Sequence, residues 1–399
     1  MPLDHAGKRK GTLQLYVGVS DNAKAKHGVL LVLTGGPGQP GVPSLGRFVP
    51  RALAAEQQDY RIVMYDQRGT GGTALRCAAL QDAMGSSDLF PPPSTAVRAC
   101  AQKLGARRQY FGTDDVVADM ESLRKALHVD TWAIDGISYG TYVGERYALA
   151  HPEHVSKLVL DSVVPHVGLA DLGVAEFKGV RRVLGTVCGT RCIADLNAVA
   201  RRYQVGPALY DALTFDSIAD PTYRTIVDLP AVLHAARGGN TSSLVQFLQT
   251  VHSYQAIAAE DLDQGLHASA LCGDWRYPWG DSSAPLAGRA AKVRKAANKL
   301  GAKTFYPFDL DTAEHNGFVG ECEPWSPVAP TPPAHGKITV PTLLVNGDHD
   351  LSTVLEWARE ELRLTTRGKL VVVPGAGHST QSRAVSPVGR NAVSAFLLG

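Results

Sequence analysis

The segment Thr131-Trp132-Ala133-Ile134-Asp135-Gly136-Ile137-Ser138-Tyr139-Gly140 carries the strongest structural signal in this chain. Its apolar and β-branched start predicts a buried strand over 131–134, and the residues from 140 to 150 predict a helix that stops before Pro152. Gly136 and Gly140 flank Ser138 in the turn between them. Because side chains at both flanking positions would collide in so sharp a turn, this pattern predicts that Ser138 is held in a strained conformation with its hydroxyl presented outward. We therefore expect Ser138 to be a nucleophile.

Short apolar runs and helical patterns alternate over much of the rest of the chain. Further buried strands are expected at 28–33, 61–65, 157–160, 342–345 and 369–373. The alternating pattern of 12–20 predicts an outer antiparallel strand, and the helical spacing of apolar residues predicts a helix over 114–127. This alternation indicates an α/β protein with a mostly parallel sheet covered by helices on both faces.

The alternation is interrupted between about residues 166 and 335. This segment has few strand candidates and ends in a Pro-rich stretch from 324 to 333. Its Ala-rich helical stretches lie at 196–212, 231–237, 243–259 and 284–300. Since the strand–helix pattern then resumes, we expect a large, mainly helical cap domain inserted between core strands. The expected division is 1–165 for the first part of the core, 166–335 for the cap and 336–399 for the second part of the core.

A serine hydroxyl is a weak nucleophile near neutral pH and needs a base. His378 is the expected base, because it follows the final predicted strand. The acid that orients it should follow the preceding strand, where 346–350 contains two carboxylates. Asp350 is preferred because it lies further past the strand end, and Asp348 is the alternative. The chain order Ser138, Asp350, His378 is that of the α/β hydrolases, and it predicts the α/β-hydrolase fold.

A glycine-rich loop, Thr34-Gly35-Gly36-Pro37-Gly38, follows the first buried strand. Without side chains, its backbone N–H groups can approach a substrate oxygen. We expect an oxyanion hole formed by the N–H groups of Tyr139 and of Gly36, or its neighbour Gly35. A phosphate-binding loop is disfavoured because the G-x-x-x-x-G-K-[ST] spacing is absent.

Charge and hydropathy exclude several function classes. The chain has 40 Lys and Arg against 38 Asp and Glu, a net charge of +2, so we expect no nucleic-acid partner and no membrane-surface role. No apolar run reaches the length of a membrane span, so membrane insertion is not expected.

The six cysteines form an even set without CxxC or zinc-finger spacing, which disfavours a structural metal. Their order suggests the bridges Cys77–Cys100, Cys188–Cys192 and Cys272–Cys322, one of about 15 possible pairings. Such bridges favour secretion. The start of the chain, Met1-Pro2-Leu3-Asp4-His5, is not a signal peptide. Either an export signal was removed and a start Met added, or the protein is cytoplasmic.

Several segments together resemble the proline iminopeptidase-type peptidases, namely 34–38 (TGGPG), 65–71 (YDQRGTG) and 136–141 (GISYGT). The closer resemblance is to the secreted tripeptidyl aminopeptidases of actinomycetes, through Val159-Leu160-Asp161 and 375–378. The likeness covers the core and is weaker in the cap, where it rests on Cys272-Gly273-Asp274 and Cys322-Glu323-Pro324-Trp325. Departures are Thr34, the pair Gln39-Pro40, and Glu145, where a smaller residue is typical.

The resemblance implies a serine exopeptidase that releases short peptides, most typically tripeptides, or single residues from free N-termini, without metal or cofactor. It also implies secretion and disulfide bonds. Substrates would be peptides, and we expect a monomer. The alternative is a carboxylesterase or other small-molecule acyl hydrolase that uses the same residues and needs no amine anchor. A third possibility, a binding protein without activity, is disfavoured by the intact set of Ser138, Asp350 and His378.

An exopeptidase must bind the α-ammonium group of its substrate, and a pair of carboxylates in the cap is the natural means. Asp274 and Glu323 are the chosen candidates because they stand next to the expected Cys272–Cys322 bridge. The other cap carboxylates considered are Glu260, Asp261, Asp263, Glu314 and Glu321. Aromatic residues that could wall an apolar side-chain pocket are Trp275, Tyr277, Trp279 and Trp325.

Overall fold

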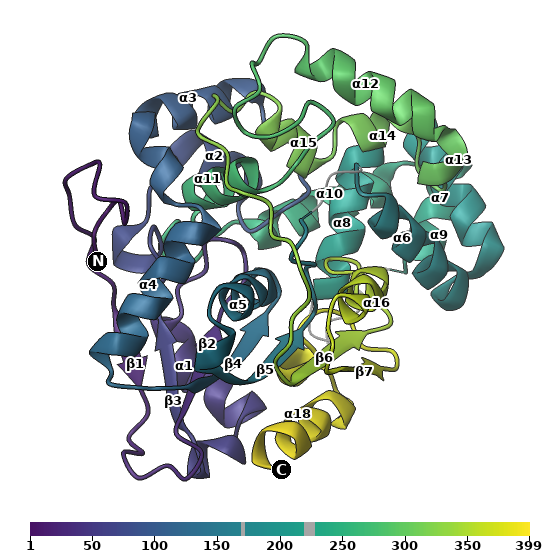
Figure 1. Ribbon diagram of the computed structural model, residues 1–399. Coiled ribbons are helices and arrows are strands. Elements are labelled where there is room, and N and C mark those ends of the chain that lie inside the picture. The colour runs from purple at the N-terminus through teal and green to yellow at the C-terminus, as the bar shows by residue number, and fades with distance from the viewer. Residues whose placement is uncertain (169–171, 219–227) are drawn as a thin grey trace.

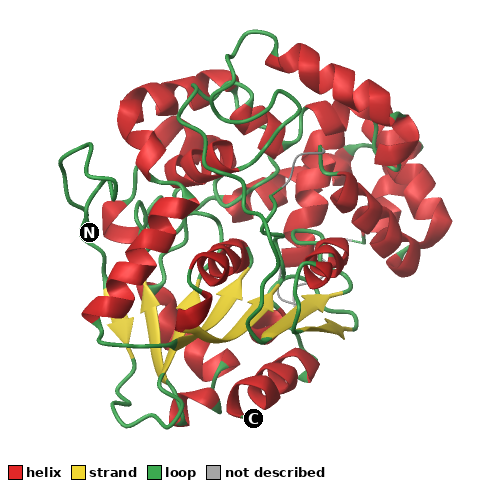
Figure 2. Cartoon of the chain, in the orientation of Figure 1, coloured by secondary structure: helices red, strands yellow, loops and turns green. Residues whose placement is uncertain are grey.

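The computed structural model describes residues 1–168, 172–218 and 228–399. A seven-stranded sheet forms its centre, in the order β1-β3-β2-β4-β5-β6-β7 (Figures 1 and 2). All neighbouring strands are parallel except β1 and β3. The strands are β1 (Val17–Val19), β2 (Val29–Leu33), β3 (Arg61–Tyr65), β4 (Trp132–Ile137), β5 (Val155–Asp161), β6 (Thr342–Gly347) and β7 (Gly368–Val373). The prediction of a mostly parallel sheet is confirmed.

The outer antiparallel strand is shorter than predicted, because β1 contains only three residues. Residues N-terminal to it pair with each other instead of with the sheet. The N–H of Leu13 donates to the carbonyl of Met1 at 2.7 Å, and the N–H of Leu3 donates to the carbonyl of Gly11 at 2.9 Å. The predicted strand is therefore divided between two partners: Leu13 pairs with Met1, whereas residues 16–20 pair with β3 and the residues at its end.

The two faces of the sheet bury alternate side chains of each strand. In β2, Leu30 and Val32 belong to one buried cluster, and Leu31 and Leu33 belong to the other. The first cluster contains residues of α1 (Val42–Ala52) and α18 (Val388–Leu398), and the second contains residues of α4 (Thr113–Ala126), α5 (Tyr139–Ala150) and α16 (Leu355–Arg363). Figure 1 shows these two helical layers on opposite sides of the sheet. A strand buried on both faces must be apolar throughout, as the sequence of β2 is.

The described residues between β5 and β6 form helices and isolated bridges but no strand. The helices are α6 (Val174–Val187), α7 (Gly189–Tyr203), α8 (Gly206–Ile218), α9 (Leu229–Arg237), α10 (Ser242–Gln255), α11 (Gln264–Asp274), α12 (Arg289–Leu300), α13 (Ala302–Phe305), α14 (Leu310–Glu314) and α15 (Gly317–Cys322). They gather above the sheet in Figure 1. We propose the division at 165 and 335 as the boundary between core and cap. No helix within the described ranges has both the length and the apolar character needed to cross a bilayer.

Helices of the first core segment also reach the cap. These are α2 (Ala78–Met84) and α3 (Ser94–Leu104), which Figure 1 places beside α11 and α15. The carbonyl of Gln255 at the end of α10 accepts the N–H of Ser86 at 2.8 Å, and the carbonyl of Leu89 accepts the N–H of Gly317 at 2.8 Å. The helical layer above the sheet is therefore built from two parts of the chain. One is the predicted insertion, and the other is the segment of the first core part that contains α2 and α3. The short α17 (Thr380–Arg383) lies after β7.

The cap helices depart from the sequence predictions at their ends. The predicted helix 196–212 is two helices, because Gln204 adopts a left-handed conformation with φ 54° at the end of α7. The predicted helix 284–300 begins only at Arg289, after Gly288 with φ 82°. The predicted helix 243–259 ends at Gln255. Helical periodicity was correct in each case, and turn residues inside the periodic stretch set the actual ends.

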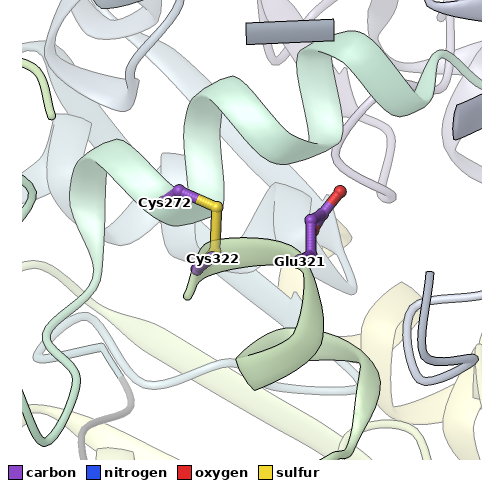
Figure 3. A group of neighbouring side chains, drawn as sticks. All are labelled: Cys272, Glu321 and Cys322. Carbon is purple, nitrogen blue, oxygen red and sulfur yellow. A yellow bond between two sulfur atoms is a disulfide. The ribbon is translucent and has the colours of Figure 1, made fainter. Parts of the chain in front are cut away.

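The six cysteines lie in three disulfides, Cys77–Cys100, Cys188–Cys192 and Cys272–Cys322. The first connects the start of α2 to α3, and the second spans the start of α7. The third joins α11 to α15 (Figure 3). The long-range bridges therefore tie together the helices that cover the sheet.

Candidate active site

Ser138 lies in the turn between β4 and α5, with φ 58° and ψ −128°. Few residues other than glycine adopt a positive φ, so this backbone is strained. Its N–H donates to the carbonyl of Asp161 at 3.0 Å, and its carbonyl accepts the N–H of Thr141 at 2.8 Å. A Cβ at Gly136 would lie 2.5 Å from the carbonyl oxygen of Gly140, and one at Gly140 would lie 2.4 Å from that of Leu33. Both glycines are therefore required by close backbone contacts, as predicted.

His378 follows β7 and meets a carboxylate at its Nδ1 atom. Asp350 Oδ2 lies 3.0 Å from Nδ1, and the hydroxyl of Thr353 lies 3.2 Å from it. Asp350 is fully buried and His378 is 8% exposed. The other oxygen of Asp350 accepts the N–H groups of Ser352 and Thr353, each at 2.9 Å. With Nδ1 facing a carboxylate, Nε2 is left to act on a substrate-side proton.

Asp348, the alternative acid, has a different position. Its Oδ1 accepts the N–H of Gly375 at 2.7 Å, and its side chain is 33% exposed. Of the two carboxylates, Asp350 is the one that the structure brings to His378. Asp348 instead braces the loop that carries the histidine.

The segment after His378 is anchored by a buried aspartate that sequence reasoning did not single out for this role. Asp161, at the end of β5, accepts the N–H and the hydroxyl of Thr380 at 3.0 and 2.9 Å and the N–H of Gln381 at 2.9 Å. Burial raises the pKa of Asp161, while these hydrogen bonds oppose the rise. Since Asp161 also accepts from Ser138 through its carbonyl, one residue positions both sides of the site. The sequence signals were its place directly after a predicted strand and its presence in the Val159-Leu160-Asp161 segment of the family resemblance.

The expected oxyanion donors lie beside Ser138. Tyr139 is the first residue of α5, so its N–H has no acceptor within the helix. Gly36 borders the same cavities as Ser138. A Cβ on Gly35 would lie 2.8 Å from Cβ of Ser138, so the glycine loop runs directly against the serine. The roles of Gly36 and Tyr139 stay predictions, and the arrangement is compatible with them.

Ser138 and His378 border one pocket of about 610 Å³, a volume typical of small-molecule sites. The cap contributes Phe215, Ile257 and Leu262 to its wall. A smaller recess of about 20 Å³ extends from Ser138, and its apolar wall consists of Val164, Leu271, Trp275, Phe318 and Trp357. Such a recess suits an apolar group attached to the reacting carbonyl.

Of the four aromatic residues predicted to wall a pocket, only Trp275 is among the described residues that border this recess. Tyr277 and Trp279 stack on each other with ring centroids 4.6 Å apart. Trp325 is buried in the hydrophobic core. Three of the four are therefore packing residues.

Asp274 and Glu323 are not brought to the serine. Neither is among the described residues that border the two cavities at Ser138. Asp274 is 6% exposed, and its oxygens accept the N–H of Thr113 at 2.9 Å, the hydroxyl of Thr113, and the hydroxyl of Thr331 at 2.8 Å. Because these contacts occupy the carboxylate, Asp274 fixes the start of α4. The assignment of these two residues as amine anchors stays a prediction, and the two cavities at Ser138 do not support it.

The carboxylate that does face the serine pocket is Asp88, on the connection between α2 and α3. Asp88 borders both cavities at Ser138, and its side chain is 20% exposed. Its Oδ1 lies 3.1 Å from Nε2 of the buried His267, whose Nδ1 lies 2.8 Å from Oε2 of Glu321. Burial alone would lower the pKa of His267, but Glu321 and Asp88 raise it to about 10. The His267 ring thus lies between two carboxylates, and Arg47, Arg51 and Arg383 also border the larger pocket.

Residue types that often bind metals also meet beside His267, in a group formed by Cys272, Glu321 and Cys322. Figure 3 shows the two sulfur atoms joined in a disulfide and the Glu321 side chain directed away from them. Disulfide sulfurs are not thiolates, so this grouping does not provide a metal site.

Two family models match the chain in order. A model described as α/β hydrolase fold matches residues 28–178, and one described as TAP-like protein matches residues 306–399. The chain is 32% identical over 186 residues to a probable proline iminopeptidase of Streptomyces coelicolor, and this match covers 46% of each of the two chains. It is 27% identical over 183 residues to a tripeptidyl aminopeptidase of the same organism, covering 41% of this chain and 34% of that one.

A longer match extends over most of the chain. Over 431 residues the chain is 25% identical to the serine protease Hip1 of Mycobacterium tuberculosis, covering 94% of this chain and 79% of that protein. The matches to the two Streptomyces proteins span less than half of those proteins' length.

Proposed function

Because the chain is an α/β hydrolase related to the proline iminopeptidases and tripeptidyl aminopeptidases, we propose that it is a serine exopeptidase acting on free N-termini. It would release short peptides, tripeptides foremost, or single residues. The coarser part of this proposal, a serine peptidase type of hydrolase, rests on the relatives and the fold. The finer part rests on one residue, Asp88, whose carboxylate borders the pocket.

In the proposed acylation step, His378 Nε2 takes the proton of Ser138 Oγ as that oxygen attacks the scissile carbonyl carbon. The carbonyl oxygen becomes an oxyanion, which the N–H groups of Gly36 and Tyr139 stabilise. Asp350 holds the ring through Nδ1 and stabilises the imidazolium. His378 then gives its proton to the leaving amine, the C–N bond breaks, and the acyl group remains as an ester on Ser138.

In the deacylation step, His378 takes a proton from a water molecule that attacks the ester carbonyl. The same N–H groups stabilise the second oxyanion. The C–O bond to Ser138 breaks, and the histidine returns the proton to Oγ. The products are the released N-terminal peptide as a carboxylate and the free enzyme, with no external reactant besides water.

The observation that carries the exopeptidase proposal is the position of Asp88 in the same pocket as Ser138. A substrate α-ammonium could pair with Asp88, whose orientation is fixed from behind by His267. A hydrogen bond between charged groups contributes about 1.5–3 kcal/mol. An ester substrate has no cation to use this group, so the same carboxylate discriminates against the carboxylesterase alternative.

The test compares substrates that differ only at the amine. We expect free tripeptide p-nitroanilides to be hydrolysed faster than their N-acetylated forms. Asp88→Asn should lower kcat/KM for the free peptides by about 10–100-fold, mainly through KM, and leave p-nitrophenyl ester hydrolysis unchanged. Asp82→Asn is the matched control, because Asp82 is an exposed aspartate on the neighbouring α2 that does not border the pocket.

Equal turnover of free and acetylated peptides would overturn the exopeptidase proposal, and ester hydrolysis without peptide hydrolysis would favour the carboxylesterase. A free-amine preference that survives in Asp88→Asn would instead show that another group binds the amine. A series of peptides of increasing length, with products identified by mass spectrometry, measures how many residues leave in each cleavage.

We further propose that the protein works in an oxidising compartment, outside the cytoplasm. The support is the set of three disulfides, two of which join separate helices. Thiol titration of denatured, unreduced protein should find no free thiol. Six titratable thiols in protein purified from its native source would contradict this location.

A further inference from the structure

Three buried side chains meet behind the helix that begins at the nucleophile. Glu145 lies on α5, His166 lies just after β5, and Glu361 lies on α16. Their exposed fractions are 0%, 1% and 0%. One potential ligand atom of each lies within 4.8 Å of those of the other two. None of them is among the described residues that border the cavities at Ser138, so this is a separate site.

The cluster is only partly satisfied by hydrogen bonds. His166 Nδ1 lies 2.8 Å from Oε1 and 3.0 Å from Oε2 of Glu361, and the N–H of His166 donates to Oε2 at 3.2 Å. Among the described residues, neither oxygen of Glu145 has a hydrogen-bond partner. Buried polar atoms without a partner are rare in proteins, and a bound ion is one explanation for them.

The charges of the cluster match a divalent cation. Within the described part of the chain, no lysine or arginine forms an ion pair with Glu145 or Glu361. Two carboxylates and a neutral imidazole carry a charge of −2 together. A divalent ion would neutralise this charge inside the protein.

We propose that Glu145, His166 and Glu361 bind a divalent transition-metal ion, with Zn²⁺ as the best fit to one imidazole and two carboxylates. Zinc bonds of about 2.0–2.2 Å to such ligands place tetrahedral donor atoms about 3.4 Å apart. Nδ1 now lies 2.8 and 3.0 Å from the Glu361 oxygens, at hydrogen-bond distance, so binding an ion would require these groups to separate by about half an ångström. The ion would take the place of the proton on Nδ1, and Glu145 would supply the third ligand.

The role of such an ion is structural. It would join the nucleophile helix α5 to α16 and to the chain segment that leads into the cap. It would stand outside the reaction, and so it is compatible with hydrolysis by Ser138 alone. The inference does not depend on the proposed peptidase function, because binding and stability are measured without substrate.

The experiment uses the whole chain without an affinity tag. The protein is stripped with a chelator, titrated with ZnCl₂, and measured by mass-spectrometric metal analysis and thermal unfolding. We expect one zinc per chain after desalting and a rise in Tm of a few degrees, since a ligand that binds only the folded state stabilises it. X-ray absorption should show nitrogen and oxygen ligands without sulfur.

Two variants separate this site from adventitious zinc on other histidines. Glu145→Gln should lose the bound zinc and the shift in Tm. Glu56→Gln is the matched control and should retain both, because Glu56 is also 0% exposed with both oxygens unpartnered among the described residues, yet lies outside the cluster. Absence of stoichiometric zinc and of any Tm shift in the unmutated chain would overturn the proposal. Zinc retained equally by Glu145→Gln would overturn it as well. If Glu145→Gln does not fold, the zinc content and the Tm shift of the unmutated chain decide the question.

Discussion

At the residue scale, Ser138 adopts a backbone conformation that its neighbours maintain. Positive φ at a non-glycine residue costs about 1–3 kcal/mol and persists only where the surrounding structure determines it. Here the carbonyl of Asp161 and the N–H of Thr141 hold both sides of the serine. The same Asp161 anchors the segment after His378 through its carboxylate. The proposed nucleophile and base are thus positioned by one buried residue at the end of β5.

Substitution of the two neighbouring aspartates tests the proposed acid. Asp350→Asn should lower kcat by about 10³–10⁴-fold, because the amide would no longer hold Nδ1–H of His378 in the required tautomer. Asp348→Asn should have a small effect, since Asp348 accepts from the backbone of Gly375. Steady-state kinetics on a chromogenic peptide or ester measures both. A larger loss in Asp348→Asn than in Asp350→Asn would reverse the assignment.

The pKa of His267 predicts a dependence of stability on pH. Its folded-state pKa of about 10 exceeds the value of about 6.5 in an unfolded chain, so the folded protein keeps a proton that the unfolded chain loses. This contribution to stability is fully present below pH 6.5 and is lost as pH rises to about 10. The free energy of unfolding should fall by up to about 1.4 kcal/mol per pH unit in this window.

Urea denaturation at pH 7, 8 and 9 measures this slope. The variant His267→Gln removes the titrating group and should show a flatter dependence than the unmutated protein. Equal slopes in the two proteins would mean that His267 does not hold its proton in the folded state.

At the element scale, the turn between β4 and α5 allows no side chain at its end glycine. Gly140→Ala would place a Cβ 2.4 Å from the carbonyl oxygen of Leu33 in β2. We expect a loss of about 1–3 kcal/mol or more in stability, and a displaced Ser138 with a drop in kcat/KM on the order of 10². Thermal unfolding and steady-state kinetics report the two effects.

The matched control is Gly144→Ala, one turn further along α5. Its nearest contact would be 3.4 Å, an ordinary van der Waals distance, and alanine is the better helix former. This variant should keep activity and lose no stability. Equal damage from both substitutions would show that α5 tolerates no added methyl group and that the turn is not special.

The strands were predicted well and the cap helices less so, for a physical reason. A strand buried on both faces is mostly apolar, as β2 is along its whole length, so its position is visible in a short window of sequence. Helix ends depend on single residues such as Gln204, whose left-handed conformation is not apparent from its side chain. Periodicity found the helices of the cap but not their limits.

At the scale of the whole molecule, the disulfides should contribute unequally to stability. By loop closure in the unfolded chain, a bridge with a separation of 50 residues contributes about 4 kcal/mol, one of 23 about 3.4 kcal/mol, and one of 4 about 1.9 kcal/mol. Paired Cys→Ala variants of each bridge should therefore lower stability in the order Cys272–Cys322, Cys77–Cys100, Cys188–Cys192. Denaturation midpoints measure the order, and the largest loss from the 188–192 pair would contradict it.

The proposed amine anchor, Asp88, lies in a part of the chain where the sequence predicted none. Carboxylates were sought in the insertion, because an inserted cap usually determines the substrate. Asp88 belongs to the first core segment. It lies between α2 and α3, which pack beside the cap helices above the sheet. Its supporting residues His267 and Glu321 lie 179 and 233 positions further along the chain, the former in direct contact with it. No local pattern connects these three residues.

The sequence by itself determined the α/β-hydrolase core and the order Ser138, Asp350, His378, because strand burial, the glycine turn and the position after each strand are local features. The tertiary structure decided which carboxylate borders the serine pocket and which one contacts His378. It also brought Glu145, His166 and Glu361 together. Such groupings depend on contacts between segments far apart in the chain, and the charge and burial of each residue are defined only after those segments have packed.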